Sequence, residues 1–386
     1  MKKMFVWIGG VFLVIVSVAI VMLAVSRKED QIHEDALYID NMGQFSNGEG
    51  FYYLNQENFL QFYDYKSNQN TIVCNKPNCE HKPWQEETPT EQRCNAYISS
   101  CHSLFTYGEK LYIVETAPKK ETLRIVQSNL DRSSQSVFAA LSSEYIGGYV
   151  IKDDKLYFAT LTGQMEKDES GMPLQTGISE VTMCSLDMRD GRVEKMVAME
   201  QRYNAQLSIL GIEGNRIYCL YGYFEERFTG LNYEEAQARL RWYVFDVETR
   251  EMKETFQELT DIDINLCKIA DHGIYYGKWT DRDSETSDLY RFDLETQENK
   301  KIVSDSHEFE IFDRKVIARE HEGNQCILYD MDSGETRSME QQEREVSILG
   351  EYEDAFIVAS YEGGVATYGH MKKAQYYKGN TDFESF

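Results

Sequence analysis

Basic residues and prolines are scarce in this sequence. Its 40 lysines and arginines are outnumbered by 65 aspartates and glutamates, which leaves a formal net charge of −25. A chain this acidic repels nucleic acid, so nucleic-acid binding is excluded as its function. Five prolines among 386 residues also exclude a proline-rich linker protein.

The sequence also lacks the short motifs of common catalytic sites. It contains no Gly-x-Ser-x-Gly elbow, no phosphate-cradling glycine loop, no His-Glu-x-x-His pair and no sialidase-type aspartate turn. It has seven histidines, and His33, His81 and His102 lie before the repeats or in a cysteine-rich segment. No pair of carboxylates stands out as the acid and base of a glycosidase. These absences favour a binding protein over an enzyme.

What the sequence does contain is a repeated pair of strand patterns. An aromatic or aliphatic strand opens each copy, and a strand ending in an acidic turn closes most copies. The openers are Phe51–Tyr53, Leu111–Ile113, Leu156–Phe158, Ile217–Cys219, Ile274–Tyr276, Val316–Ala318 and Phe356–Val358. The closers are Phe62–Asp64, Leu186–Asp187, Phe245–Thr249, Phe292–Thr296 and Tyr329–Gly334, with Asn129 in the aspartate position of another copy.

Self-similarity at intervals of roughly 40–60 residues is typical of a β-propeller, in which small sheets are arranged around an axis. We therefore predict an all-β fold with seven blades; six blades plus an irregular sheet is the alternative. Residues 36–40 are expected to close the ring by pairing with the last sheet. The aspartates of the closers are interpreted as turn formers, because their side chains cap tight turns.

Three segments lengthen the repeats and are expected to be insertions. They are residues 66–103, 162–180 and 223–239. Residues 163–177 are polar and contain glycine, which indicates a loop. Residues 233–240 have a short helical pattern. Loops on one rim of a propeller are the usual place for binding residues.

The N-terminal residues predict a membrane anchor. An uncharged run covers residues 4–25, between Lys2-Lys3 and Arg27-Lys28, and a helix of this length reaches about 33 Å, enough to span a bilayer core. We predict a single-pass cell-membrane protein with a cytoplasmic tail at 1–3, a transmembrane signal anchor at 4–25, a stalk at 26–36 and an extracytoplasmic propeller at 37–386. Cleavage after the Ala24-Val25-Ser26 site is the alternative.

Four of the eight cysteines lie close together, within an insertion at about residues 74–102. They are Cys74, Cys79, Cys94 and Cys101, with His81 and His102 among them. Three thiolates and an imidazole suit a structural zinc ion, for which we select Cys74, Cys79, His81 and Cys94. One or two disulfides are the alternative in an oxidising compartment. The remaining cysteines are expected to be buried apolar residues: Cys184, Cys219, Cys267 and Cys326.

The segment Val73-Cys74-Asn75-Lys76-Pro77-Asn78-Cys79-Glu80-His81, together with Cys94-Asn95-Ala96-Tyr97, resembles a motif of an uncharacterised family of membrane-anchored bacterial β-propellers. These proteins come from Gram-positive anaerobes and are likened to the propeller of lipoprotein-receptor-related proteins. The resemblance covers nearly the whole chain and implies an extracytoplasmic propeller, but no activity. The spacer at residues 82–93 and the additional Cys101-His102 depart from that motif.

The function expected from the sequence is a surface-tethered propeller that binds an extracellular protein or carbohydrate. The alternative is a hydrolase or lyase acting on extracellular polysaccharide. Such an enzyme would have two carboxylates about 5–10 Å apart in an aromatic pocket. Acidic loops around the fifth repeat are candidate Ca²⁺ ligands, with solvated turns as the simpler interpretation. Their residues are Asp261, Asp263, Asp281, Asp283 and Asp288.

Overall fold

The computed structural model describes residues 36–39, 43–85, 87–117, 122–141, 143, 148–167, 173–227, 237–281, 286–320, 325–340 and 346–386. The expected tail, the anchor and all of the stalk except its last residue lie outside these ranges. Within these ranges no helix is both long and apolar enough to cross a membrane.

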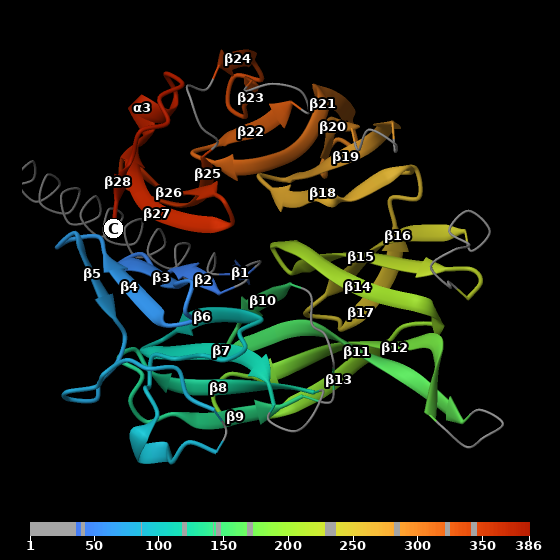
Figure 1. Cartoon of the computed structure of the whole chain (residues 1–386). Coiled ribbons are helices and arrows are strands. Elements are labelled where there is room, and N and C mark those ends of the chain that lie inside the picture. Colours follow the sequence, from blue (N-terminus) through green and yellow to red (C-terminus); the bar gives the residue numbers. More distant parts are fainter. Residues whose placement is uncertain are drawn as a thin grey trace, which may run out of the picture.

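The described strands form one sheet of nine strands, one of seven and three of four. Seven successive antiparallel units of four strands can be followed through these sheets (Figure 1). The first two are β2 (Gln44–Ser46), β3 (Gly50–Leu54), β4 (Leu60–Asp64) and β5 (Gln69–Ile72), then β6 (Ser103–Tyr107), β7 (Lys110–Thr116), β8 (Leu123–Asn129) and β9 (Ser136–Ala140). The next two are β10 (Tyr149–Lys152), β11 (Lys155–Lys167), β12 (Pro173–Asp187) and β13 (Val193–Ala198), then β14 (Arg202–Glu213), β15 (Arg216–Phe224), β16 (Ala238–Asp246) and β17 (Glu251–Thr255). Pairing of β12 with β14 joins the third and fourth units.

The fifth unit contains β18 (Ile262–Ala270), β19 (Gly273–Asp281), β20 (Thr286–Asp293) and the first half of β21 (Asn299–Phe312). The second half of β21 begins the sixth, with β22 (Lys315–Glu320), β23 (Gln325–Asp330) and β24 (Thr336–Glu340). The seventh contains β25 (Ser347–Tyr352), β26 (Ala355–Glu362), β27 (Val365–Lys372) and β28 (Glu384–Ser385), with the short helix α3 (Lys373–Tyr376) before β28.

The seven openers each lie on a strand, and in every unit it is the second strand rather than the first. These strands are β3, β7, β11, β15, β19, β22 and β26. Their central residues are buried on both faces of the sheet, because units pack on either side. Turns in which both central residues have positive φ lead into several of them, for example at Asp153-Asp154 and Asp271-His272. Such turns match the twist of the strands that they join.

The closer aspartates act as turn formers, as the sequence indicates. Asp246 Oδ1 accepts hydrogen bonds from the backbone N–H groups of Glu248 and Thr249 at 3.0 and 2.9 Å. Asp293 Oδ1 accepts the equivalent bonds from Glu295 and Thr296 at 3.1 and 2.9 Å. These carboxylates therefore stabilise the turn between the third and fourth strands, and their contacts are those of structural residues.

Side chains close the ring. Hydrophobic clusters join each unit to the next, and one cluster joins the last unit to the first through Ile357, Phe51 and Tyr63. The rings of Tyr65 and Tyr352 stack at 3.9 Å between centroids across the same boundary. Among the described residues, no strand of the first unit pairs with a strand of the seventh. Side-chain contacts hold the ends of the ring together, and they include a hydrogen bond between Tyr63 Oη and His370 Nδ1 at 3.0 Å.

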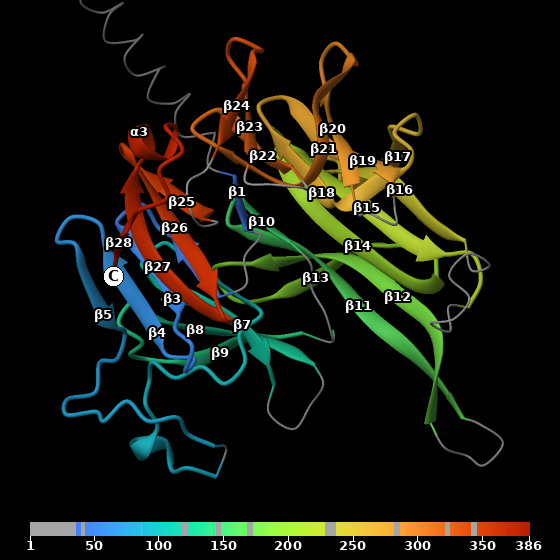
Figure 2. The ribbon, with the colours of Figure 1, turned by 45° about the horizontal axis from the view of Figure 1, so that its top comes forward.

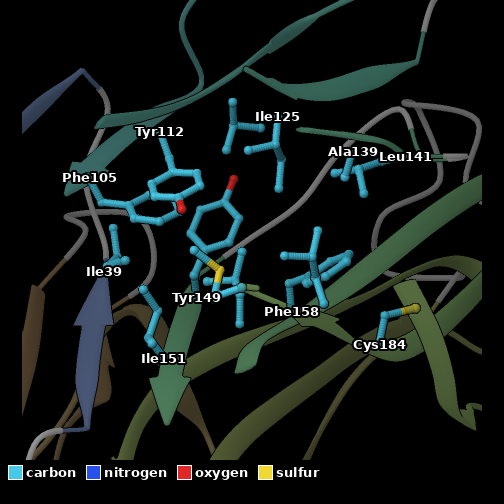
Figure 3. Close-up of a cluster of buried hydrophobic side chains, with 14 of the residues drawn as sticks. Ile39, Phe105, Tyr112, Ile125, Ala139, Leu141, Tyr149, Ile151, Phe158 and Cys184 are labelled. Atoms are coloured by element: carbon cyan, nitrogen blue, oxygen red, sulfur yellow. The ribbon is translucent and has the colours of Figure 1, made fainter. Parts of the chain in front are cut away.

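The N-terminal strand β1 (Leu37–Ile39) pairs with β10 of the third unit, opposite Tyr149, Val150 and Ile151. The expectation that residues 36–40 pair with the last sheet is therefore wrong. The reason is visible in Figure 3: Ile39 lies among Phe105, Tyr149 and Ile151, and all four belong to the cluster between the second and third units. Burial of Ile39, and the hydrogen bond from Tyr38 Oη to the Ile209 carbonyl at 2.9 Å, fix β1 there.

Two of the predicted insertions differ from expectation. Residues 163–167 and 173–177 extend the β11–β12 hairpin, with Lys167 opposite Pro173, and are not a loop. In the third insertion, residues 228–236 lie outside the described ranges, and residues 238–240 begin strand β16 in place of the expected helix. In both cases pairing with a neighbouring strand overrides the local pattern.

The ring has two different faces. One face, here called the loop face, carries residues 73–102 and the far ends of β11 and β12, which lie at the bottom of Figure 2. The opposite face, here called the turn face, carries the turns that follow β20 and β23, at the top of that view.

Candidate metal centre

Residues 73–102, here called the cysteine loop, run between β5 and β6 on the loop face. Backbone hydrogen bonds hold two points of the loop beside the start of β4. Val73 N–H donates to the Leu60 carbonyl at 2.9 Å, and Leu60 N–H donates to the Ala96 carbonyl at 2.8 Å. The loop is therefore attached to the first unit at Val73 and at Ala96, on either side of the four candidate ligands, and the backbone N–H of its last residue, His102, donates to the Val114 carbonyl of the second unit.

The loop brings together Cys74, Cys79, His81 and Cys94. Their sulfur and imidazole nitrogen atoms all lie within 4.8 Å of one another. Cys74 Sγ lies 3.9 Å from Cys94 Sγ, and His81 Nδ1 lies 3.4 Å from the same sulfur. Cys94 is buried, and the other three are half-buried. The four residues selected from the sequence thus converge on one point.

The backbone on either side of Cys79 turns sharply to achieve this. Asn78 has φ of 57° and His81 has φ of 48°, in the left-handed region where asparagine and histidine occur more often than most residues. These turns direct Cys79 and His81 toward the same centre. A left-handed conformation at a non-glycine residue has an energetic cost that the surrounding contacts must offset.

Lys76 supplies one of these contacts. Its Nζ donates hydrogen bonds to the carbonyls of Thr90, Glu91 and Arg93, at 3.0, 3.2 and 2.6 Å. These carbonyls lie in and just after the 3₁₀ helix η1 (Thr90–Gln92). Lys76 therefore ties the segment of Cys74 and Cys79 to the segment that leads into Cys94.

Trp84 also holds the segment that leads into Cys94. Its Nε1–H donates to the Cys94 carbonyl at 3.1 Å, and the Arg93 guanidinium lies over its ring at 4.6 Å from the centroid. Arg132, at the turn after β8, donates from Nε to the Asn95 carbonyl at 3.1 Å. The cluster is thus supported from the second unit as well as from the first.

The pKa values of the Cys74 and Cys94 thiols are shifted in opposite directions. Burial acts to raise the pKa of Cys74, but backbone N–H groups of Lys76 and Asn95 hydrogen-bond to its sulfur, and the net effect is a lowered pKa. Burial raises the pKa of Cys94 to about 12. A bound cation deprotonates a coordinating thiol outright, whatever the pKa of that thiol in the absence of the cation.

The other cysteines lie outside this group. Cys101 Sγ donates to the Ser103 carbonyl at 3.5 Å, and His102 Nε2 lies 2.9 Å from Thr116 Oγ1, so neither joins the four residues. The remaining four cysteines are buried, as predicted: Cys184, Cys219, Cys267 and Cys326. All eight cysteines belong to the described residues, and each is a free thiol there.

The acidic residues of the fifth unit do not gather into a second metal-ligating group within the described residues. Asp263 is buried and accepts a hydrogen bond from Ser287 Oγ at 3.1 Å. Asp288 pairs with Lys301 Nζ at 2.6 Å. Asp261 is exposed, and Asp283 and the side chain of Asp281 lie outside the described part of the chain. The described contacts are those of structural carboxylates.

A cleft of about 1310 Å³ lies between the cysteine loop and the outer strands of the second unit. Lys76, Trp84, Arg93 and Cys94 line it from the loop, and Arg124 and Arg132 line it from the second unit. Glu115 is the one acidic residue among its described lining residues, and it accepts a hydrogen bond from Arg124 Nε at 2.8 Å. Burial lowers the pKa of Arg132 to about 10, so its guanidinium remains charged at neutral pH.

The architecture is similar to that of several solved structures. A prolyl endopeptidase matches with a TM-score of 0.56 at 11% identity, over 90% of this chain and 48% of its own length. An oligogalacturonate lyase in complex with manganese matches with a TM-score of 0.51 at 11% identity, over 88% and 90%. The fold is that of a β-propeller.

A third match is an acylaminoacyl peptidase of Pyrococcus horikoshii, with a TM-score of 0.51 at 14% identity, over 88% of this chain and 52% of that one. This chain therefore spans about half the length of the two peptidases. No protein-family model and no curated protein sequence matches it. At these identities the similarity establishes the fold and nothing about activity.

The sequence identified the four clustered residues but not their supports. Lys76 lies between Cys74 and Cys79 in the sequence, and this position could have indicated that it supports the cluster. Arg132 lies 38 residues beyond Cys94 in the chain and has a positive φ of 63°. Nothing in its local sequence indicates that it contacts the cysteine loop.

Proposed function

We propose that this chain is a membrane-tethered, extracytoplasmic propeller of seven blades that acts as a binding module. Its ligand site is the cleft beside the cysteine loop, and its ligand is a short anionic oligomer that bears carboxylates. The supporting observation is the charge of the cleft: four basic residues and one acidic residue line it, in a chain whose net charge is −25.

The charged residues that line the cleft are mainly basic, whereas the chain as a whole is acidic. A cleft with walls of low dielectric concentrates the field of its charged groups, and so raises the local concentration of ions of opposite sign. Arginine binds carboxylates through paired hydrogen bonds, and Arg93 and Arg124 are half-exposed. Trp84 adds an aromatic surface for stacking. The ligand is short because the acidic surface elsewhere repels a long polyanion.

Binding is favoured over glycoside hydrolysis because of the composition of the cleft. A glycosidase needs two carboxylates, one to protonate the leaving group and one to act as base or nucleophile. Glu115 is the one acidic residue among the described lining residues, and its pairing with Arg124 occupies it.

The position of β1 orients the proposed tether. β10 runs from the loop face to its turn with β11 on the turn face, and β1 is antiparallel to it, with Leu37 opposite Ile151. Leu37 therefore lies at the turn-face end of β1. An anchor on the N-terminal side of Leu37 places the loop face, with its cleft, away from the membrane. Intact mass of membrane-extracted protein should then include residues 2–26, and a mass beginning at Arg27 would contradict the tether.

The test of binding uses the full-length protein in a neutral detergent, with hexagalacturonate, hexaglutamate and uncharged maltohexaose as probes. We expect calorimetric binding of an anionic probe that weakens with added salt, and no binding of maltohexaose. Arg93→Gln should weaken binding roughly tenfold, since it removes a charge-assisted hydrogen bond. Arg124→Gln should weaken binding at least as much, because it also leaves the Glu115 carboxylate in the cleft without its basic partner. Arg337→Gln, at an exposed position on β24, is the matched control. Equal affinity for maltohexaose, or no binding of either anionic probe, would refute the proposal.

A further inference from the structure

We infer that Cys74, Cys79, His81 and Cys94 bind one zinc ion in a closed tetrahedral site, and that this ion fixes the cysteine loop. The inference is independent of the ligand proposed above. It starts from the donor set: three thiolate sulfurs and one imidazole nitrogen are a standard set for structural zinc. The Cys-x₄-Cys-x-His spacing is unusual, so the geometry has to carry the argument.

The distances agree with a tetrahedral zinc ion. Zinc–sulfur bonds of about 2.3 Å and zinc–nitrogen bonds of about 2.0–2.1 Å place two sulfurs about 3.8 Å apart, and sulfur and nitrogen about 3.6 Å apart. The corresponding distances here are 3.9 Å for Cys74 and Cys94 and 3.4 Å for His81 and Cys94. The widest separation of 4.8 Å requires a closure of about 1 Å to reach tetrahedral spacing.

The same distances argue against disulfides. A disulfide holds its sulfurs about 2.05 Å apart, whereas Cys74 and Cys94 are 3.9 Å apart. A disulfide between any two of the three cysteines would also not explain why the third thiol and His81 lie within 4.8 Å of them. A single cation accounts for all four atoms together.

The surroundings suit the charge of such a site. Three thiolates, a neutral imidazole and Zn²⁺ have a net charge of −1, and binding releases three thiol protons to solvent. Lys76 lies between two of the ligands in sequence, and Arg132 donates to the carbonyl of Asn95, next to Cys94. Arg132 is 3% exposed, and its described hydrogen-bond partners are all uncharged. Arg132 also interacts electrostatically with Cys94, as well as with Glu115 and Cys101, so a buried cation lies close to the anionic centre.

The site is structural, because its four protein donors leave no open position for substrate or water. His81 ligates through Nδ1, which is the nitrogen that faces Cys94. Cys94 and Lys76 also line the cleft, so the ion fixes one wall of it. Loss of zinc is therefore expected to loosen the loop while the propeller remains folded, since the blades have their own clusters of buried residues.

The test is metal analysis of the full-length protein purified under reducing conditions from zinc-replete medium. We expect about one zinc per chain, and eight titratable thiols once the protein is denatured with a chelator. Cobalt exchanged into the site should give the intense visible absorption of tetrahedral cobalt and a thiolate-to-metal charge-transfer band. Because the cobalt spectrum is measured on the unmodified protein, the test does not depend on any variant folding.

Variants then assign the ligands. Cys79→Ser and His81→Ala should each lower zinc content at least severalfold and expose the loop to trypsin at Lys82 and Arg93. Cys101→Ser is the matched control, since Cys101 belongs to the same loop but lies outside the cluster, and it should retain zinc and the cobalt spectrum. Absence of metal with eight free thiols, fewer than eight thiols owing to disulfides, or zinc loss in Cys101→Ser would each overturn the assignment. None of these readouts involves binding to the cleft.

Discussion

Closure of the ring by side chains leads to a prediction that a double-mutant cycle can test. Tyr65, after β4, and Tyr352, at the end of β25, belong to the first and last units, and their rings stack with centroids 3.9 Å apart and planes 5° apart. The perturbations are Tyr65→Ala, Tyr352→Ala and the double variant. Both residues are half-buried, so each single change should cost about 1–2 kcal/mol of unfolding free energy, part of the value for a fully buried aromatic ring.

The informative quantity is the coupling between the two changes. A stacked aromatic pair contributes about 0.5–1.5 kcal/mol beyond the area that it buries, and the double variant should lose less than the sum of the single variants by this amount. Urea unfolding of the full-length protein in neutral detergent, followed by circular dichroism, measures all four free energies.

The control pairs Tyr65 with Tyr361, a tyrosine of the same seventh unit that is 61% exposed. Changes at sites that do not touch are usually additive to about 0.3–0.5 kcal/mol. A coupling of Tyr65 with Tyr352 no larger than that of Tyr65 with Tyr361 would mean that the first and last units do not pack together in solution.

Two further predictions concern the repeat itself. Tyr157, on β11, is 4% exposed, so Tyr157→Ala should cost about 3–5 kcal/mol in the same urea titration, and a loss below about 1 kcal/mol would show that it is not a core residue. The pKa of Asp293 is lowered to about 2, chiefly by the hydrogen bond from the Thr296 N–H group and also by the hydrogen bond from the Arg291 side chain. Its stabilising effect is therefore present above its unfolded pKa of about 3.9 and is lost as pH falls toward 2; Asp293→Asn should flatten the decline in stability over this interval, and an unchanged pH profile would contradict that role.

The local pattern of the sequence was sufficient to predict the blades. Leu111, Leu156 and Phe356 each occur within a short aromatic or aliphatic run that follows a turn, and all three are fully buried on second strands. A strand buried on both faces must be apolar throughout, so a continuous apolar run in the sequence indicates a strand inside the sheet. The four candidate ligands were also predictable, because cysteines and histidines are rare enough in this chain for their density to be informative.

Pairing between distant strands could not be predicted in the same way. Residues 163–167 have a polar sequence, yet they continue β11 because β12 offers them a partner. β1 pairs with the third unit because Ile39 fits a cluster between two other units. β21 serves two units along its 14 residues. Ser304-Asp305-Ser306 has a turn-like sequence, and Asp305 has a positive φ of 52°, yet the strand continues through this segment. Each outcome depends on which partner is adjacent in space.

The pairing of β1 has a mechanical consequence. Force applied through the N-terminal residues reaches the ring first at Leu37, and from there it is directed along β1, parallel to the strand. It therefore shears the three residue pairs with β10 simultaneously, which resists extension better than opening them one at a time. The hydrogen bond of Tyr38 to Ile209 shares the force with the fourth unit. A tension on the chain is thus distributed over the third and fourth units before it reaches the boundary between the first and the seventh, which no described strand pairing holds closed.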